Sequence, residues 1–238
     1  MTLPAATPQS MTLPQGFRPE AVPVQQIDSH LPAVPSEQQS IAALRARFAR
    51  PTIWTPEWVT ERPGLSQAPA IQAAVLIPVV KRPRPGILLT QRSALLAKHS
   101  GQIAFPGGRV DAEDASAVAA ALREAREEVG LDARHVEVLG ELPSYTTGSG
   151  YEVQPVVALV DADVPLHANV DEVADIFEVP LAHVLDPANH RHHQYQYEGL
   201  SRQWLSMPYH DPQVQRDRFI WGVTASILRN FYRFMQAP

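Results

Sequence analysis

GGRVDAEDASAVAAALREAREEVGL, residues 107 to 131, predicts an amphipathic helix with an unusual concentration of acidic side chains. At about 100° per residue, Glu124, Glu127 and Glu128 share an arc of about 100° beside and opposite an apolar stripe. The stripe that would face the core consists of Val118, Ala121, Leu122, Ala125 and Val129. Because Glu124 and Glu128 are four residues apart, their repulsion costs an isolated helix about 0.2–0.5 kcal/mol.

The position of these acids in the helix also opposes local stability. Gly130 predicts the end of the helix, so all three carboxylates lie near the negative end of the helix dipole. Hard divalent cations such as Mg²⁺ and Mn²⁺ are bound by carboxylate oxygens. A bound metal ion therefore accounts for the convergence of the acids, and the alternative is a solvated face on a surface helix.

The order Arg-Glu-x-x-Glu-Glu-x-Gly makes the stretch resemble a known motif, the Nudix box. Its usual form is Gly, five residues, Glu, seven residues, Arg-Glu, an apolar residue, any residue, Glu-Glu, any residue, Gly and an apolar residue. Arg123 to Leu131 match this form position by position. Counted from Gly108, the first acid is Asp114 instead of Glu, and eight residues separate it from Arg123. Asp114 is therefore not among the predicted metal ligands.

A second resemblance lies directly upstream. Leu88 to Gly108, LLTQRSALLAKHSGQIAFPGG, resembles the additional signature of the bacterial Nudix branch that acts on coenzyme A and its derivatives. Ala97 departs from this signature, because the branch usually carries Arg there. The resemblance also covers three later segments, 169–173, 177–181 and 220–225. In all it spans about two thirds of the chain.

The resemblance implies a Nudix-type α/β/α sandwich with a mixed β-sheet and a metal-dependent pyrophosphohydrolase activity. The expected substrate is coenzyme A or a derivative, cleaved to 4′-phosphopantetheine and adenosine 3′,5′-bisphosphate. The expected cofactor is Mg²⁺ or Mn²⁺, held by Glu124, Glu127 and Glu128. Arg123 is expected to orient a glutamate towards the metal, and either Glu127 or Glu172 is expected to be the general base.

Substrate contacts are predicted from the same two motifs. Gly107 and Gly108 would let the backbone approach the diphosphate, because glycine accepts dihedral angles that other residues avoid. The other predicted substrate-binding residues are Arg92, Lys98, His99, Gln102 and Arg109. Two alternatives stay open: another nucleoside diphosphate derivative as the substrate, which Ala97 favours, and a ligand-sensing module without catalysis, which the intact acids disfavour.

Composition narrows the class of protein. The chain has 238 residues, a formal net charge of −5 and no cysteine. The acidic balance disfavours a general nucleic-acid-binding role, and the lack of cysteine excludes disulfides and thiolate metal sites. Neither a signal peptide nor an apolar run of about 20 residues is present. The expectation is a soluble cytoplasmic protein with a small-molecule diphosphate substrate, without nucleic-acid or membrane partners, and with a homodimer left open.

The predicted organisation has three parts. Residues 1–35 are rich in Pro and polar residues and are expected to be a disordered tail. Residues 36–69 are expected to pack on the domain through a helix over about 37–49 and an extended segment with Trp54 and Trp58. Residues 70–238 form the hydrolase domain, with strands over 70–80, 86–91, 136–139, 153–160 and 175–179 and a helix over 220–235.

Two further motifs receive no catalytic role. His190-Arg-His-His193 is interpreted as a polar loop, since it lacks the i, i+4 helical spacing and the third ligand of a catalytic zinc site. The stretch 144–150, SYTTGSG, lacks the Lys-Ser/Thr of a P-loop and is interpreted as a loop beside the substrate.

Overall fold

The computed structural model describes residues 17–50, 53–58, 60, 70–96, 99–197 and 200–238. An eight-stranded mixed sheet forms the centre of the molecule. Its strands are β2 (Ile71–Val80), β3 (Gly86–Arg92), β4 (Ile103–Ala104), β5 (Gly107–Arg109), β6 (Val136–Glu141), β7 (Tyr145–Thr146), β8 (Tyr151–Val160) and β9 (Val173–Pro180). The strands predicted over 70–80, 86–91, 136–139, 153–160 and 175–179 are therefore confirmed.

The parallel pair β2 and β8 is the core of this sheet. Ile71 pairs with Tyr151, and the register continues to Val80 and Val160. Both strands are apolar on both faces: Ile77 and Val157 join one hydrophobic cluster, while alternate residues join another. A strand that is covered on both faces is a nearly continuous apolar run, which explains why the sequence marked these two strands clearly.

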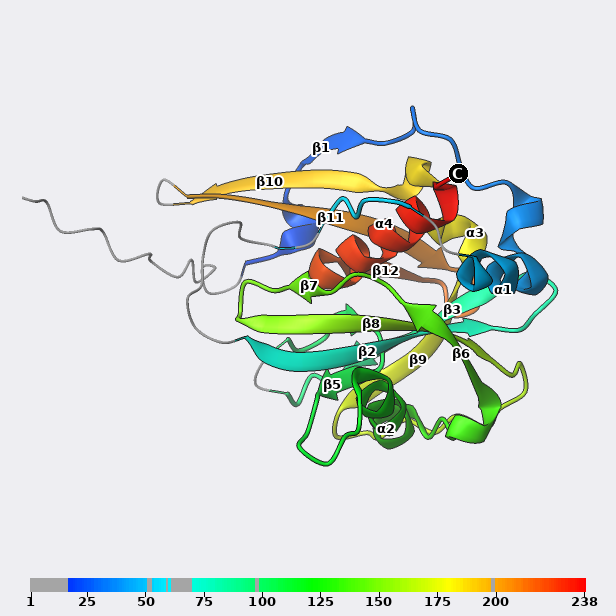
Figure 1. Ribbon diagram of the computed structural model, residues 1–238. Coiled ribbons are helices and arrows are strands. Elements are labelled where there is room, and N and C mark those ends of the chain that lie inside the picture. Colours follow the sequence, from blue (N-terminus) through cyan, green and yellow to red (C-terminus); the bar gives the residue numbers. More distant parts are fainter. Residues whose placement is uncertain (1–16, 51–52, 59, 61–69, 97–98, 198–199) are drawn as a thin grey trace, which may run out of the picture.

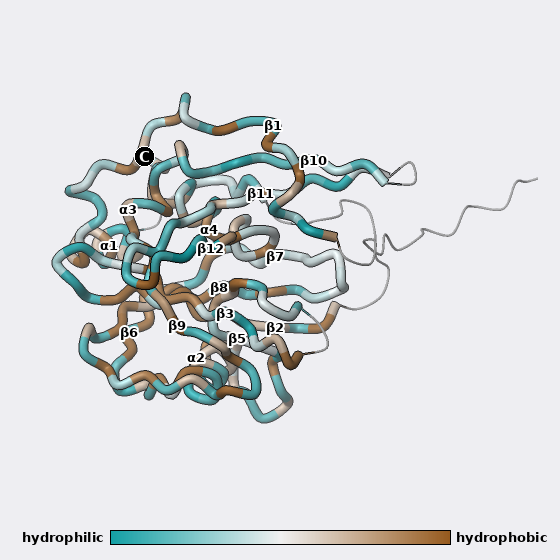
Figure 2. Tube along the Cα trace, turned by 180° about the vertical axis from the view of Figure 1, so that it is seen from behind, coloured by the Kyte–Doolittle hydropathy of each residue, from teal (hydrophilic) through white to brown (hydrophobic). Residues whose placement is uncertain are grey.

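Helices cover both faces of the mixed sheet, as the predicted α/β/α sandwich requires. They are α1 (Ile41–Ala49), α2 (Ala117–Val129), α3 (Leu181–Val184) and α4 (Gly222–Gln236), with 3-10 turns at Pro19–Ala21, Ser36–Gln39, Ala133–His135 and Pro187–Asn189. Figure 1 shows α2 on one face of the sheet and α4 on the other. In Figure 2 the region where β8 and β9 lie is brown, in contrast to the teal β10.

Helix boundaries differ slightly from the prediction at two places. The helix expected over 37–49 begins at Ile41, because Ser40 caps it by accepting a hydrogen bond from the Ala43 amide at 3.2 Å. The C-terminal helix begins at Gly222 instead of residue 220, since Ile220 and Trp221 end a strand and Gly222 turns the chain with a φ of 62°.

A second sheet, absent from the sequence prediction, covers α4. It is antiparallel, with strands in the order β1 (Val24–Ile27), β10 (Arg191–Tyr197), β11 (Leu200–Asp211) and β12 (Arg216–Trp221). The interpretation of 190–193 as a polar loop is wrong, because His192 and His193 pair with Leu205 and Trp204 across a hairpin. The polar composition of β10 hid the strand.

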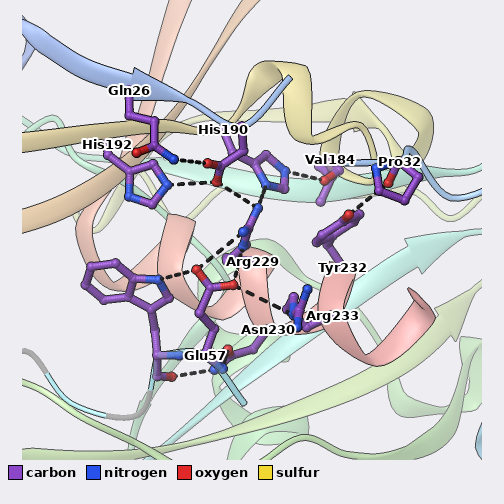
Figure 3. Close-up of polar contacts among 12 residues, drawn as sticks. Gln26, Pro32, Glu57, Val184, His190, His192, Arg229, Asn230, Tyr232 and Arg233 are labelled. Atoms are coloured by element: carbon purple, nitrogen blue, oxygen red, sulfur yellow. Dashed lines mark hydrogen bonds and ion pairs between the residues drawn. The ribbon is translucent and has the colours of Figure 1, made fainter. Parts of the chain in front are cut away.

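The N-terminal segment also differs from the prediction. Residues 17–35 were expected to belong to a disordered tail, yet Val24–Ile27 form the edge strand of the second sheet, and Val34 is buried in the core. A buried polar cluster holds this segment in place (Figure 3). Its centre is Arg229 on α4, whose guanidinium lies 3.0 Å from Asp28 Oδ2 and 2.8 Å from Glu57 Oε2.

His190 completes this cluster as a neutral ring. Its Nδ1 accepts a hydrogen bond from Arg229 Nη1 at 2.9 Å, and its Nε2 donates one to the Val184 carbonyl at 2.8 Å. Burial lowers the pKa of His190 to about 4. Because both ring nitrogens are already bonded within the protein, His190 is a structural residue, in agreement with the absence of a predicted zinc site.

The cluster predicts that Asp28→Asn destabilises the protein, although residue 28 lies in the supposed tail. Asp28 and Arg229 are 2% and 3% exposed, and removal of one partner of a buried ion pair costs about 3 kcal/mol. Urea unfolding should show this loss. Glu20→Gln, which removes an exposed ion pair with Arg18, is the control and should change the free energy of unfolding by less than about 1 kcal/mol. An equally small effect of Asp28→Asn would contradict the anchoring role of the cluster.

Candidate active site

The three acidic side chains of helix α2 differ in their exposure to solvent. Ala121, Ala125 and Val129 are fully buried against the mixed sheet, as the apolar stripe predicted. The helix ends at Gly130, which has a φ of 70°. The Glu124, Glu127 and Glu128 side chains are 15%, 55% and 4% exposed. The Glu128 side chain points inward between α2 and the start of β5, which the shared acidic arc of the helical wheel did not indicate.

Glu128 is the buried acid of the site. Its Oε2 accepts a hydrogen bond from the Gly107 amide at 3.2 Å, and its Oε1 lies 3.8 Å from Arg92 Nη1. Burial raises the pKa of Glu128 to about 7, and repulsion from Glu124 and Glu172 adds to the rise, against the opposing effects of the Gly107 amide and Arg92. A nearby positive charge would therefore stabilise the ionised form of the Glu128 carboxylate.

Glu124 lies against the glycine pair. A Cβ atom at Gly108 would come within 2.4 Å of Glu124 Oε1, and one at Gly107 would come within 2.4 Å of the Ala74 carbonyl oxygen. Close packing against backbone therefore requires glycine at position 107, whereas a side chain at position 108 would displace the Glu124 carboxylate. Burial raises the pKa of Glu124, and Glu127 and Glu172 raise it further by repulsion, while Arg123 opposes the rise.

Arg123 connects the acids of α2 to the loop before it. One guanidinium nitrogen lies 3.0 Å from both Glu124 Oε1 and Glu127 Oε2. The other end of the guanidinium forms a bidentate pair with Asp114, at 3.1 and 2.9 Å, and donates to the Arg109 carbonyl at 3.0 Å. This geometry is what an orienting role for Arg123 requires, and it explains Asp114 as a partner of Arg123.

Glu172 reaches the same site from the segment before β9. Its amide donates to the Asn169 carbonyl at 2.9 Å, and its own carbonyl accepts from the Ser93 amide at 2.8 Å. The Asn169 amide in turn donates to the Glu128 carbonyl at 2.9 Å. Asn169 therefore ties this segment to α2. Asn169 was not predicted as a site residue, although it lies three positions from Glu172.

Two of the predicted substrate-binding residues, His99 and Gln102, lie in the turn after β3, and Arg92 ends that strand. The Arg92 amide donates to the Gln102 carbonyl at 2.9 Å, and His99 Nδ1 lies 2.9 Å from Gln102 Oε1. Lys98 is outside the described residues. Arg109 lies on β5, with its guanidinium carbon 5.9 Å from the centre of the Tyr151 ring. Tyr151 is a further neighbour of the site that the sequence analysis missed.

The donor set suits a hard divalent cation in its chemistry. Glu124, Glu128 and Glu172 repel one another, and carboxylate oxygens are the ligands that Mg²⁺ and Mn²⁺ prefer. In the described part of the chain, no three His, Cys, Asp or Glu side chains are grouped closely enough to hold a metal ion as placed. Glu124 and Glu128 lie on the more buried side of α2, where a cation could reach both, while Glu127 is turned towards Arg123 and the solvent.

Comparison with known families agrees with this arrangement. A model of the NUDIX domain matches residues 70–200. The chain belongs to the Nudix family. It is therefore a Nudix hydrolase of the pyrophosphohydrolase class, a family that generally uses divalent metal ions. The matched region contains β2 to β10, and thus both the acids of α2 and the turn after β3.

Two relatives that are similar in sequence support the family assignment. The Nudix hydrolase NudL of Escherichia coli (strain K12) is 51% identical over 161 residues, which cover 66% of this chain and 79% of the relative. NudL of Shigella flexneri is 49% identical over 173 residues, covering 71% and 85%. A solved Nudix hydrolase, RenU from M. smegmatis, aligns with a TM-score of 0.43 and 25% identity over 56% of this chain and 84% of its own. In the described part of this chain, no helix is long and apolar enough to cross a membrane.

The burial of Glu128 predicts how Glu128→Gln changes stability without divalent metal. The pKa of Glu128 in the folded protein, about 7, is above its ordinary value of 4.5, so the parent loses stability as the pH rises from about 4.5 through 7. The variant lacks this loss and should be the more stable protein at pH 8, with a smaller difference at pH 5. Urea unfolding at the two pH values measures this change.

Metal addition provides the second half of this experiment. Mg²⁺ or Mn²⁺ should raise the Tm of the parent more than that of Glu128→Gln, because the stabilisation depends on affinity for the folded state. Glu127→Gln, on the exposed side of α2, is the matched control and should remain within about 0.5 kcal/mol of the parent at both pH values. Parallel pH profiles of parent and Glu128→Gln would contradict a buried, ionisable carboxylate.

Proposed function

We propose that the protein is a Mg²⁺- or Mn²⁺-dependent diphosphatase that cleaves coenzyme A, or a close derivative, to 4′-phosphopantetheine and adenosine 3′,5′-bisphosphate. The observation that carries the proposal is the contact of the buried Glu128 with Gly107 and Arg92. This contact joins the metal-type acids of α2 to Leu88–Gly108, the stretch that resembles the coenzyme A signature. The diphosphate chemistry is supported by the family, and the choice of coenzyme A by that resemblance.

The reaction adds one water molecule across the diphosphate. Water attacks one phosphorus atom, the bridging P–O bond breaks, and the proton of the water passes to a general base. A divalent cation bound at Glu124 and Glu128 would neutralise charge on the phosphoryl oxygens and lower the pKa of water. The protein contributes position: Gly107 and Gly108 keep side chains away from the diphosphate, and Arg123 holds the Glu124 carboxylate.

Of the two candidate bases, the geometry favours Glu172. Glu127 is exposed and ion-paired with Arg123 at 3.0 Å, so its carboxylate is already committed to a cation. Repulsion from Glu172 raises the pKa of both Glu124 and Glu128. Among the described residues, its side chain has a single long hydrogen bond, from Asn169 Nδ2 at 3.4 Å. A base in this position can accept a proton beside the proposed metal ligands.

The proposed substrate contacts follow from the cations near this site. Arg92 lies 3.8 Å from Glu128 Oε1, and its Nε is buried without a hydrogen-bond partner among the residues that the structure describes. It is therefore available to a phosphate oxygen once a metal shares the charge of Glu128. His99, Gln102 and Arg109, together with Lys98, are proposed to contact the remaining phosphates of the substrate.

We expect coenzyme A to be hydrolysed with a kcat/KM about tenfold higher than that of dephospho-coenzyme A. The 3′-phosphate offers one more charge-assisted hydrogen bond, and about 1.4 kcal/mol corresponds to a factor of ten. Mass spectrometry of the products from a panel of coenzyme A species, ADP-ribose and dinucleoside polyphosphates, with and without Mn²⁺, tests this expectation. Glu124→Gln should have about a hundredfold lower activity. This control shows whether the products come from the protein itself.

Other outcomes distinguish the alternatives. If ADP-ribose or a dinucleoside polyphosphate is the preferred substrate, coenzyme A is the wrong substrate and another nucleoside diphosphate derivative replaces it. If the protein binds members of the panel and hydrolyses none of them, it is a ligand-sensing module.

A further inference from the structure

Arg218 on β12 is one of the most deeply buried charged side chains, at 2% exposure, and lies outside both sequence motifs. Its Nη2 lies 2.6 Å from Asp175 Oδ2 and 3.1 Å from Asp211 Oδ2. Its Nη1 donates to Gln91 Oε1 at 3.1 Å, and its guanidinium carbon lies 4.1 Å from the centre of the Phe177 ring. A buried arginine with this many partners fixes the geometry of the groups around it.

The first of these groups is Gln91, which connects Arg218 to the turn after β3. Gln91 accepts from Arg218 through Oε1 and donates through Nε2 to the Gly101 carbonyl, at 3.4 Å. Since a guanidinium can only donate, Arg218 determines which way the Gln91 amide faces. The turn held by Gln91 contains His99 and Gln102, which we propose to contact the substrate.

The second group is Asp175, which lies on β9 three residues after Glu172. In the β3–β9 pair, Gln91 pairs with Asp175 and Arg92 pairs with Val173, so Ala174 is an extra residue in β9. Such a bulge bends a strand and re-aims neighbouring side chains, and bulges often lie next to active sites. Arg218 holds the residues on both sides of this pairing, Asp175 through an ion pair and Gln91 through a hydrogen bond. Glu172 directly precedes the strand that begins at Val173.

We infer that Arg218 is a positioning residue, which fixes the turn at residues 99–102 on one side of the site and the bulge that aims Glu172 on the other. It does so from the opposite sheet, through Gln91 and Asp175, without touching the substrate. The inference rests on the proposed function for the roles of Glu172 and the turn. The placement of the two segments by Arg218 can be measured independently of activity.

The test combines three variants with two readouts. In Arg218→Met, amide hydrogen exchange should accelerate in both 99–104 and 172–176. Asp175→Asn should accelerate amide exchange in residues 172–176 and lower kcat about tenfold. Gln91→Leu should accelerate amide exchange in residues 99–104 and raise KM about tenfold. Both of these variants leave the Arg218–Asp211 ion pair in place, so they stay informative if Arg218→Met folds poorly. Kinetics are measured on the best substrate of the parent, well below each Tm.

Arg229→Met is the matched control, because Arg229 is a buried arginine of similar exposure, 3%. The charged partners of Arg229 are Asp28 and Glu57. Arg229→Met should therefore lower the Tm, leave kcat and KM within about twofold of the parent, and leave amide exchange in the two segments unchanged. Unchanged exchange in the three test variants would overturn the inference, as would equal losses in Arg229→Met. A parent without activity on any diphosphate would refute only the proposed function, since the exchange result still decides the role of Arg218.

Discussion

Glu128 lies where α2, β3 and the start of β5 meet, and an ionised carboxylate there loses most of its hydration. The Gly107 amide and Arg92 replace part of that hydration, but the raised pKa shows that they replace it incompletely. This constraint explains several local features. Gly107 and Gly108 keep the backbone close to the acids, Arg123 draws Glu124 and Glu127 to one side, and Asn169 ties the Glu172 segment to the end of α2. A cation placed near Glu128 would compensate the charge that these contacts leave uncompensated.

Buried arginines perform a different task on the far side of the mixed sheet. Arg229 joins α4 to the N-terminal segment and to His190, directly before β10, and Arg218 joins β12 to β3 and β9. In each case a planar group with several donors satisfies polar atoms from separate elements at once. Such ties are costly to bury and costly to break, so they specify one arrangement of the second sheet on α4. Through Gln91 and Asp175, that arrangement also reaches the proposed substrate turn and Glu172.

The two sheets therefore contribute unequally to the proposed chemistry. The mixed sheet, α2 and the turn between β3 and β4 carry every residue predicted to bind metal or diphosphate that the structure describes. The second sheet carries none of them, yet it covers α4 and supplies Arg218. This division agrees with the family match, which includes all of the mixed sheet and ends at residue 200, before most of β11.

Much of the centre of the molecule was predictable from local pattern. The two-sided apolar runs of β2 and β8, the stripe of α2 and its end at Gly130 depend on residues close in sequence, and the structure has them as predicted. The acids of α2 were also evident, because their order resembles a known motif. What the helical wheel could not show was that Glu128 points inward. Its environment is made by Gly107 and Arg92, which are 21 and 36 residues away along the chain.

The second sheet and the N-terminal segment were determined only by tertiary structure. β10 is polar and rich in histidine, and Val24–Ile27 is a short strand in a Pro-rich region, so neither carries a strong local signal. Their stability comes from partners distant in sequence: Asp28 needs Arg229, and His193 stacks on Trp204 across the hairpin. Sequence alone determined which residues prefer the core and which motif carries the acids. The tertiary structure decided which polar groups are buried together, because that depends on pairing and charge compensation between distant segments.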